Sequence, residues 1–261
     1  MIIYTIPVGE VIKFTILLTR IGGIMAFMPF FNSLNVPVST RIAFVLGLSW
    51  LLYPVLSPAL KVPALGLGSM TVLIGGELLI GLLIGLISRF LFVGFELAGQ
   101  LLGFQMGFSM INAIDPQTQV QTTVLSVSQS LLGLLVFLGL DGHHWLITAV
   151  CESFIYLAPL KLHLPSSVSG ALLQLSGEMF VIGFKLAAPV LVVLTLTDVI
   201  FAIIGRAAPQ VQIMIIGLPL KNILGFFLLS ISFYFVPIFV SQYLTTLHGR
   251  ITALLHLLVL K

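Results

Sequence analysis

The chain contains very little charge and almost no cysteine. Only 7% of its 261 residues are charged, 59% are hydrophobic, and the mean hydropathy is +1.22. Because soluble domains carry roughly 25% charged residues, a water-soluble fold of this size would lack the polar side chains to cover its surface. The single cysteine, Cys151, excludes an internal disulfide. The composition therefore predicts an integral membrane protein.

The chain also lacks motifs that would indicate other classes of function. Its net charge of +3 comes from 11 scattered Lys and Arg residues, without a basic patch, so we expect no nucleic-acid binding. It has neither a glycine-rich phosphate loop nor a His-Glu-x-x-His zinc motif, so we expect no nucleotide hydrolysis, no metal site and no cofactor. The N-terminal stretch has no basic region or small-residue cleavage site, so we expect the first apolar segment to be retained.

Long apolar segments make up most of the chain. A segment of about 18 or more apolar residues can span a membrane as a helix, in which all backbone polar groups are satisfied within the segment. Polar or proline-containing breaks between the segments are typical of turns. Because no repeat or linker divides the chain, we predict an all-α membrane protein with one domain over residues 1–261. The eight expected helices lie near residues 11–31, 41–56, 71–95, 123–140, 144–160, 178–205, 210–236 and 238–258.

A few ionisable residues interrupt these apolar segments. Charges at membrane depth are costly and usually face a bundle interior, a protein partner or water. Glu178 and Lys185 are seven residues apart and therefore share one helix face, too far apart to pair directly. Two interpretations remain for them: a functional relay, or separate pairing with other helices or a place outside the bilayer. The remaining ionisable residues of this kind are Glu77, Arg89 and Asp198.

The stretch GQLLGFQMGFSMINAIDPQTQVQTT, residues 99–123, differs from the rest of the chain. Glycine recurs in it three times at intervals of four residues, and the same spacing occurs once more upstream. Glycines at this spacing leave a bare strip on one helix face, where another backbone can approach closely. The pattern is common in membrane helices. The glycines at which we predict helix packing are Gly81, Gly85, Gly99, Gly103 and Gly107.

Bulky apolar side chains lie between these glycines, and the chain then becomes polar. Methionine is flexible and polarizable, and it can repack against varied surfaces. Asp115-Pro116 is expected to end the helix, and mainly Gln and Thr follow. Irregular polar backbone at membrane depth is tolerated only inside protein or beside water, so at that depth this segment would line or block a passage. The alternative is a surface loop that joins two spans.

Enzyme chemistry has little support in the sequence. Asp141-Gly142-His143-His144 contains neighbouring imidazoles, but adjacent helical residues point about 100° apart. A turn with capping polar groups explains this motif better. Ser109 with one of the histidines could imitate an intramembrane serine protease, but no oxyanion-hole pattern accompanies them. We therefore expect no enzymatic activity.

Three sequence blocks together resemble one protein family. They are FELAGQLLGFQMGFSMINAIDPQTQVQ, LLVFLGLDGHHWLI and GRAAPQVQIMIIGLPLK. In length, hydropathy and motif order, nearly the whole chain is similar to the FliR family of flagellar export proteins, which is grouped with the T-component of virulence type III secretion export gates. The third block looks more like the flagellar type than the virulence type.

The resemblance implies a function, a location and partners. Such proteins form an export gate with FliP and FliQ in the bacterial inner membrane, inside the flagellar basal body, and FlhB surrounds its cytoplasmic entrance. Tilted helical hairpins build the gate, and unfolded flagellar subunits pass through its centre. A central re-entrant-like loop of the FliR-type subunit helps to close the pore. The resemblance thus implies contacts with membrane lipid, no cofactor and no enzymatic activity.

The resemblance also assigns roles to residues. The family's loop corresponds to residues 107–121, and Ala208-Pro209-Gln210 would form a structural bend outside the pore. The apolar part of the loop would help to seal the resting pore, because a hydrophobic constriction can close a channel by dewetting. The apolar part of this seal would be Met106, Phe108, Met110, Ile111 and Ile114, and its polar tip would be Asp115, Pro116, Gln117 and Gln119. Asn112 and Thr118 are expected in the same pore loop.

Two other functions remain open from the sequence. A virulence-type secretion homologue would work by the same mechanism. A secondary transporter of small solutes would also have broken helices and buried charges, but it would be expected to show an internal repeat, which this sequence lacks.

Overall fold

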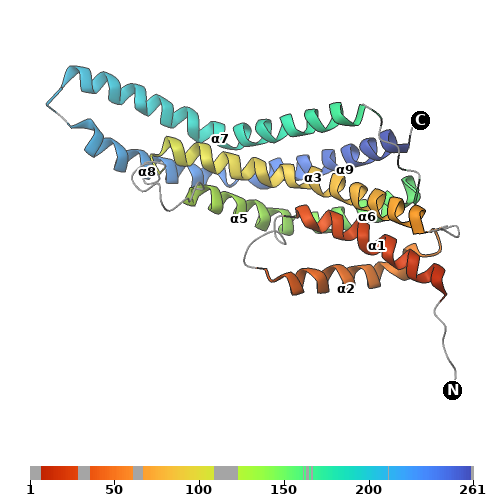
Figure 1. Ribbon diagram of the computed structural model, residues 1–261. Coiled ribbons are helices and arrows are strands. Elements are labelled where there is room, and N and C mark those ends of the chain that lie inside the picture. The colour runs from red at the N-terminus through yellow and green to blue at the C-terminus, as the bar shows by residue number, and fades with distance from the viewer. Residues whose placement is uncertain are drawn as a thin grey trace. The chain divides into compact units, whose positions relative to one another are not determined.

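A computed structural model describes residues 7–28, 36–60, 67–108, 123–160, 162, 165, 167–210 and 212–259. This part of the chain forms eight α-helices and no strand (Figure 1). Each apolar segment predicted from the sequence overlaps one helix, which confirms the all-α class, although α3 and α7 extend well beyond the predicted segments 71–95 and 178–205. The helices are α1 (Val8–Phe27), α2 (Val38–Leu56), α3 (Leu67–Gln105), α5 (Val124–Gly139), α6 (Gly142–Tyr156), α7 (Ser167–Ala207), α8 (Ile213–Ser232) and α9 (Val236–Val259).

Four of the described helices, α2, α3, α7 and α8, are long and apolar enough to cross a membrane. α5 and α6, which are bent by 70° at the break between them, could form a fifth span. α3 has 39 residues and α7 has 41. At 1.5 Å per residue each is roughly 60 Å long, about twice the hydrocarbon thickness of a bilayer. Helix tilts rarely exceed about 40°, so part of each helix extends beyond the hydrocarbon layer.

The chain packs as two compact units, and each unit combines separate stretches of sequence. The first unit comprises Met1–Arg89, Asp141–Leu175 and Leu244–Lys261, and the second comprises Phe90–Leu140 and Ser176–Tyr243. α3 and α7 therefore each contribute residues to both units. A single membrane domain over residues 1–261 stays a prediction.

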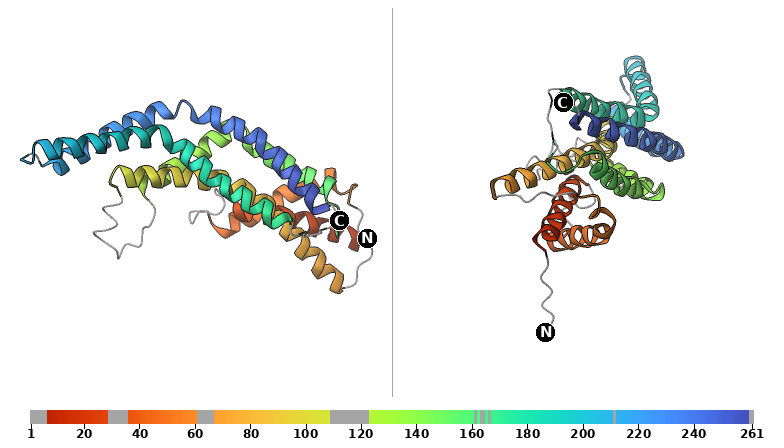
Figure 2. Two further views of the ribbon diagram at one scale, coloured as in Figure 1. Left: turned by 90° about the horizontal axis from the view of Figure 1, so that it is seen from above. Right: turned by 90° about the vertical axis from the view of Figure 1, so that its right-hand side faces the viewer.

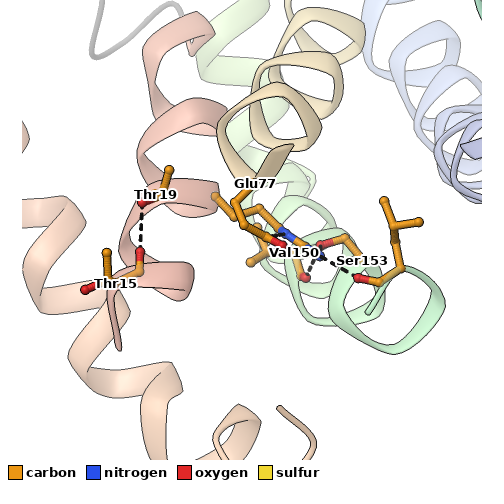
Figure 3. Close-up of polar contacts among 7 residues, drawn as sticks. Thr15, Thr19, Glu77, Val150 and Ser153 are labelled. Carbon is orange, nitrogen blue, oxygen red and sulfur yellow. Dashed lines mark hydrogen bonds and ion pairs between the residues drawn. The ribbon is translucent and has the colours of Figure 1, made fainter. Parts of the chain in front are cut away.

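A buried ion pair connects three helices of the first unit. Arg20 Nε on α1 donates to Glu77 Oε2 on α3 at 2.6 Å, and the two side chains are 0% and 1% exposed. Arg20 Nη1 donates to Ser153 Oγ on α6 at 3.1 Å, and Nη2 donates to the Leu157 carbonyl at 3.1 Å. Figure 3 labels Glu77 on α3 and Ser153 on α6, which both accept hydrogen bonds from the Arg20 guanidinium. Glu77 thus faces the interior of this unit, as expected for a charge in an apolar segment.

Glycines bring α1 and α3 together beside this ion pair. A Cβ atom at Gly81 would overlap the backbone carbonyl of Arg20, and one at Gly85 would lie 2.6 Å from the carbonyl oxygen of Ile24. Because backbone atoms cannot move aside as the end of a flexible side chain can, this approach of the two helices requires glycine at both positions.

The second unit has an apolar core formed by α3, α5, α7 and α8. α7 and α8 run side by side in this unit, as both Figure 1 and Figure 2 show. Pro189 removes one backbone hydrogen bond from α7 because proline has no N–H, yet the helix continues past it. The buried side chains of this core are Ala98, Leu102, Met106, Leu125, Ala187, Val190, Leu194 and Leu229.

Candidate functional site

The candidate site is the C-terminal end of α3, where the predicted loop begins. Of the predicted seal, Met106 and Phe108 are described. On the other side of the loop, the described chain resumes at Thr123, which precedes α5 and was not a predicted member of the seal. The remaining predicted seal residues lie outside the described part of the chain, as does Ser109 of the protease hypothesis. They are Met110, Ile111, Asn112, Ile114, Asp115, Pro116, Gln117, Thr118 and Gln119.

A glycine cap ends α3. Gln105 is its last residue, and Gly107 has a φ angle of 85°, in the left-handed region that glycine adopts at little cost. The Phe108 N–H donates to the Gly103 carbonyl at 2.9 Å, and the Gly107 N–H donates to the Phe104 carbonyl at 3.1 Å. These two bonds together form a Schellman motif, which satisfies carbonyl groups at the helix end.

This cap changes the interpretation of the glycine spacing. α3 stops at this cap and does not extend to Asp115-Pro116, the predicted helix end, which lies outside the described residues. Gly107 lies beyond the helix end and supplies the turn. The strip on the helix itself therefore consists of Gly99 and Gly103.

Gly99 and Gly103 allow the start of α5 to lie directly against α3. A Cβ atom at Gly99 would lie 2.8 Å from the backbone nitrogen of Ser126, and one at Gly103 would lie 2.6 Å from Thr123 Oγ1. The Thr123 hydroxyl accepts from the Ser126 N–H at 3.2 Å as the N-cap of α5, and it donates to the Gly99 carbonyl at 3.4 Å. The two described ends that flank residues 109–122 are therefore held side by side.

α8 also contacts the end of α3. Met106 is buried, and its Sδ and Cε atoms lie 2.8 and 2.6 Å from the position that a Cβ would take at Gly225 of α8. The Phe108 and Phe226 rings make an edge-to-face contact, with centroids 6.1 Å apart and an interplanar angle of 68°. Both described members of the predicted seal thus pack against this chain's own helices.

A polar cluster holds the last residue of α3. Gln105 Nε2 donates to Asp198 Oδ2 on α7 at 2.7 Å, and Lys221 Nζ on α8 donates to Asp198 Oδ1 at 2.7 Å. The Lys221 side chain is 12% exposed and that of Asp198 is 45% exposed. Thr195 Oγ1 lies 3.5 Å from the same Gln105 amide nitrogen. We call Gln105, Asp198 and Lys221 the polar clamp.

Sequence reasoning found only part of this cluster. Asp198 was identified as a charge in an apolar segment, and its pairing with Lys221 agrees with the rule that such charges find partners. The sequence did not indicate a role for Gln105, because several other glutamines occur in the same stretch. Only the fold brings it to Asp198.

The relay suggested for Glu178 and Lys185 stays a prediction. Lys185 is exposed and lines a cavity of about 380 Å³ beside Pro189 in the second unit. Apolar side chains of α7, α8 and α9 make up most of the remaining lining, with Ser232 as a further polar residue.

Three potential metal ligands gather at the start of α6. One ligand atom each from Asp141, His143 and His144 lies within 4.8 Å of the others. The group lies at a helix N-terminus, where the partial positive charge of free N–H groups disfavours a cation. The predicted turn is present, with Asp141 at a φ angle of 56° and the His144 N–H donating to its carbonyl at 2.9 Å. However, the Asp141 side chain makes no capping hydrogen bond.

Known proteins match the chain over most of its length. Residues 11–247 match the family described as Bacterial export proteins, family 1. The flagellar biosynthetic protein FliR of Bacillus subtilis (strain 168) is 31% identical over 223 residues, which cover 84% of this chain and 85% of that protein. The FliR proteins of Escherichia coli (strain K12) and Aquifex aeolicus (strain VF5) are 29% and 28% identical, covering 82% and 90% of this chain and 81% and 91% of their own lengths. The chain therefore belongs to family 1 of the bacterial export proteins.

Proposed function

We propose that this chain is the FliR-type subunit of a flagellar type III export gate in the bacterial inner membrane. The observation that carries this proposal is its similarity, over most of its length, to proteins named flagellar biosynthetic protein FliR. Its proposed partners are FliP and FliQ, with FlhB at the cytoplasmic entrance, and its cargo is unfolded flagellar subunits. It acts within the basal body as a conduit subunit, without a cofactor or enzymatic activity of its own.

The exposed apolar surface of the long helices supports a place in a larger assembly. Only 22% of the most apolar window of α7 and 17% of that of α8 is buried within the chain. α7 is also roughly twice as long as the hydrocarbon core of a bilayer is thick. Apolar surface beyond the hydrocarbon layer needs a protein partner instead of lipid, because large exposed apolar patches in water mark interaction sites. Helical partner subunits would meet this need.

The segment over residues 107–121 is proposed to contribute to the seal of the resting pore. A gate that passes chains of any sequence benefits from apolar side chains that deform, and such a constriction excludes ions by dewetting. Met106 and Phe108 act at the root of this segment, since they pack against α8. The other proposed members are Met110, Ile111, Asn112, Ile114, Asp115, Pro116, Gln117, Thr118 and Gln119.

Deletion of residues 110–119 tests the seal. The expected result is an export gate that still co-purifies with its FliP and FliQ partners, in cells whose inner membrane leaks ions and small dyes at rest. The root contacts at Gly103, Thr123 and Gly225 are kept in this variant, so assembly should survive. A leak at the wild-type level in a normally assembled gate would reject the seal.

A further inference from the structure

We infer that the polar clamp is a positioning device that fixes the end of α3, and with it the start of the proposed pore segment, so that the resting gate stays tight. The inference rests on the proposed function of that segment as a seal. Asp198 acts through Gln105 and does not itself enter the pore segment. It is therefore a positioning residue and not a member of the seal.

One carboxylate joins three helices in the clamp. Asp198 accepts from Gln105 through Oδ2 and from Lys221 through Oδ1, both at 2.7 Å. An ionised carboxylate can only accept hydrogen bonds, so the Gln105 side chain must present its amide nitrogen, which fixes the orientation of the amide. Hydrogen bonds to a charged group are shorter and about twice as strong as neutral ones. The rotation and axial position of the α3 end are thus tied to α7 and α8.

The clamp lies directly before the point where α3 ends. Gln105 is the last helical residue, and the Schellman turn at Met106, Gly107 and Phe108 follows at once. A displacement of Gln105 would therefore also displace Gly107, where the proposed pore segment begins. The other α8 contacts in this region, Met106 at Gly225 and Phe108 on Phe226, are apolar. Apolar burial has little directional preference, whereas the hydrogen bonds of the polar clamp fix both distance and direction.

α8 contributes both kinds of contact from one short stretch. Lys221 and Gly225 are four residues apart and lie on the same helix face, and Phe226 follows directly. Leu218, one turn before Lys221, has its Cδ2 atom 2.8 Å from the position that a Cβ would take at Gly107. This single face of α8 therefore supports the α3 end at the clamp, at the helix cap and at the residue beyond it.

A purely structural role is the competing explanation, and an isosteric substitution separates the two. Gln105→Glu keeps the shape of the side chain and leaves the Asp198–Lys221 ion pair in place, but it turns the donor into an acceptor. Two carboxylates then face each other where one hydrogen bond had been, and like charges repel. Adding Asp198→Asn restores one donor and one acceptor with their places exchanged. A fold defect caused by altered packing at residue 105 would not be corrected by this second change.

The experiment uses cells that contain the complete export apparatus. Inner-membrane leak of a small dye is measured for wild type, Gln105→Glu and Gln105→Glu/Asp198→Asn, together with co-purification of partner subunits. The control is Lys13→Gln, which breaks a 3.0 Å ion pair with Glu10 in the first unit. We expect Gln105→Glu to raise the resting leak roughly tenfold. Loss of a hydrogen bond to a charged group changes the equilibrium between two conformations by about this factor, here between the tight and the leaky gate. The double variant and the control should stay near the wild-type leak.

Two results would overturn the inference. One is a wild-type leak in an assembled Gln105→Glu gate, and the other is a leak that Asp198→Asn fails to reduce. If Gln105→Glu does not assemble, Gln105→Leu removes the donor without adding a charge, and the same leak is expected of it. Deletion of residues 110–119 is measured in parallel. A leaky deletion beside a tight Gln105→Glu gate refutes the clamp alone, whereas a tight deletion refutes the proposed seal itself.

Discussion

At the scale of single residues, Arg20 has a partner for each of its donor nitrogens. Its three nitrogens donate to Glu77, Ser153 and the Leu157 carbonyl, and its guanidinium carbon lies 3.9 Å from the centre of the Phe154 ring. The Leu157 carbonyl follows the C-terminus of α6, where a helix carries partial negative charge and favours a cation. A buried charge is tolerated when it is paired in this way, and removing one partner leaves the other charge uncompensated.

Arg20→Met tests this arrangement. It leaves the Glu77 carboxylate buried without its partner, so we expect the first unit to lose about 3–5 kcal/mol of stability. The measurement is thermal unfolding of the purified export-gate complex in detergent. Arg20→Met/Glu77→Leu should recover most of the loss, because replacing both members of a buried pair by apolar residues is often nearly neutral.

Lys13→Met is the matched control on the same helix. It breaks the more exposed Glu10–Lys13 pair, and an exposed pair contributes at most about 1 kcal/mol. If Arg20→Met unfolds at the wild-type temperature, the pair does not hold α1, α3 and α6 together.

At the scale of elements, the glycines of α3 differ in whether helix packing requires them. In the first unit Gly81 and Gly85 admit the backbone of α1, and in the second unit Gly99 and Gly103 admit the start of α5. Gly75, on the same helix, has open space around its Cβ position. One helix therefore contains glycines that are required for packing and at least one that is not.

Gly99→Ala and Gly75→Ala are expected to change stability in opposite directions. A methyl group at residue 99 would push against the Ser126 backbone, and overpacking of this kind costs about 1–3 kcal/mol. At residue 75 alanine meets nothing and gains up to about 1 kcal/mol of helix propensity over glycine. Unfolding temperature and yield of the assembled complex are the measurements. Gly103→Leu, a larger change beside Thr123, should block assembly.

Equal stability of the two alanine variants would contradict the packing role of Gly99. Normal assembly of Gly103→Leu would contradict that of Gly103. The two positions are tested separately, because Gly99 faces backbone and Gly103 faces a side chain.

The sequence predicted where the helices lie better than where α3 stops. Each of the eight predicted apolar segments overlaps one helix, because long apolar stretches favour helices in membrane proteins. Glycine at every fourth residue, however, is the same sequence pattern whether all the glycines lie on the helix face or the last one forms the helix cap. Gly107 is a cap because its φ angle is positive, and no spacing rule reports a backbone angle. The residues around Gly107 did not predict that α3 ends there.

Partners of the charged residues could not be predicted from the sequence. Glu77 and Asp198 were recognised as costly in apolar segments, and that much follows from solvation. Arg20 lies 57 residues from Glu77, and Gln105 lies 93 residues from Asp198. Pairs at such separations depend on how the helices pack, and the absence of a repeat in the sequence leaves that packing undetermined.

At the scale of the whole molecule, the long helices fit a protein that is only partly surrounded by lipid. α3 and α7 exceed the hydrocarbon thickness even when tilted, and most residues in the apolar windows of α7 and α8 are not buried within the chain. A solitary transporter would leave the excess apolar surface in water. A subunit that shares this surface with other helical subunits would bury it, and the same assembly could enclose a passage lined by the segment after α3.

A photo-crosslinking probe at Gln117 tests whether that passage exists. In cells that hold a stalled export substrate, we expect an adduct between the probe and the substrate, because the proposed seal must touch any chain that passes it. The adduct should disappear when the substrate is not expressed, which is the control. Adducts only with FliP-like or FliQ-like neighbours would instead make residues 107–121 a joint between subunits. The family assignment would stand in that case, but the clamp at Gln105 would then position an assembly contact and not a seal.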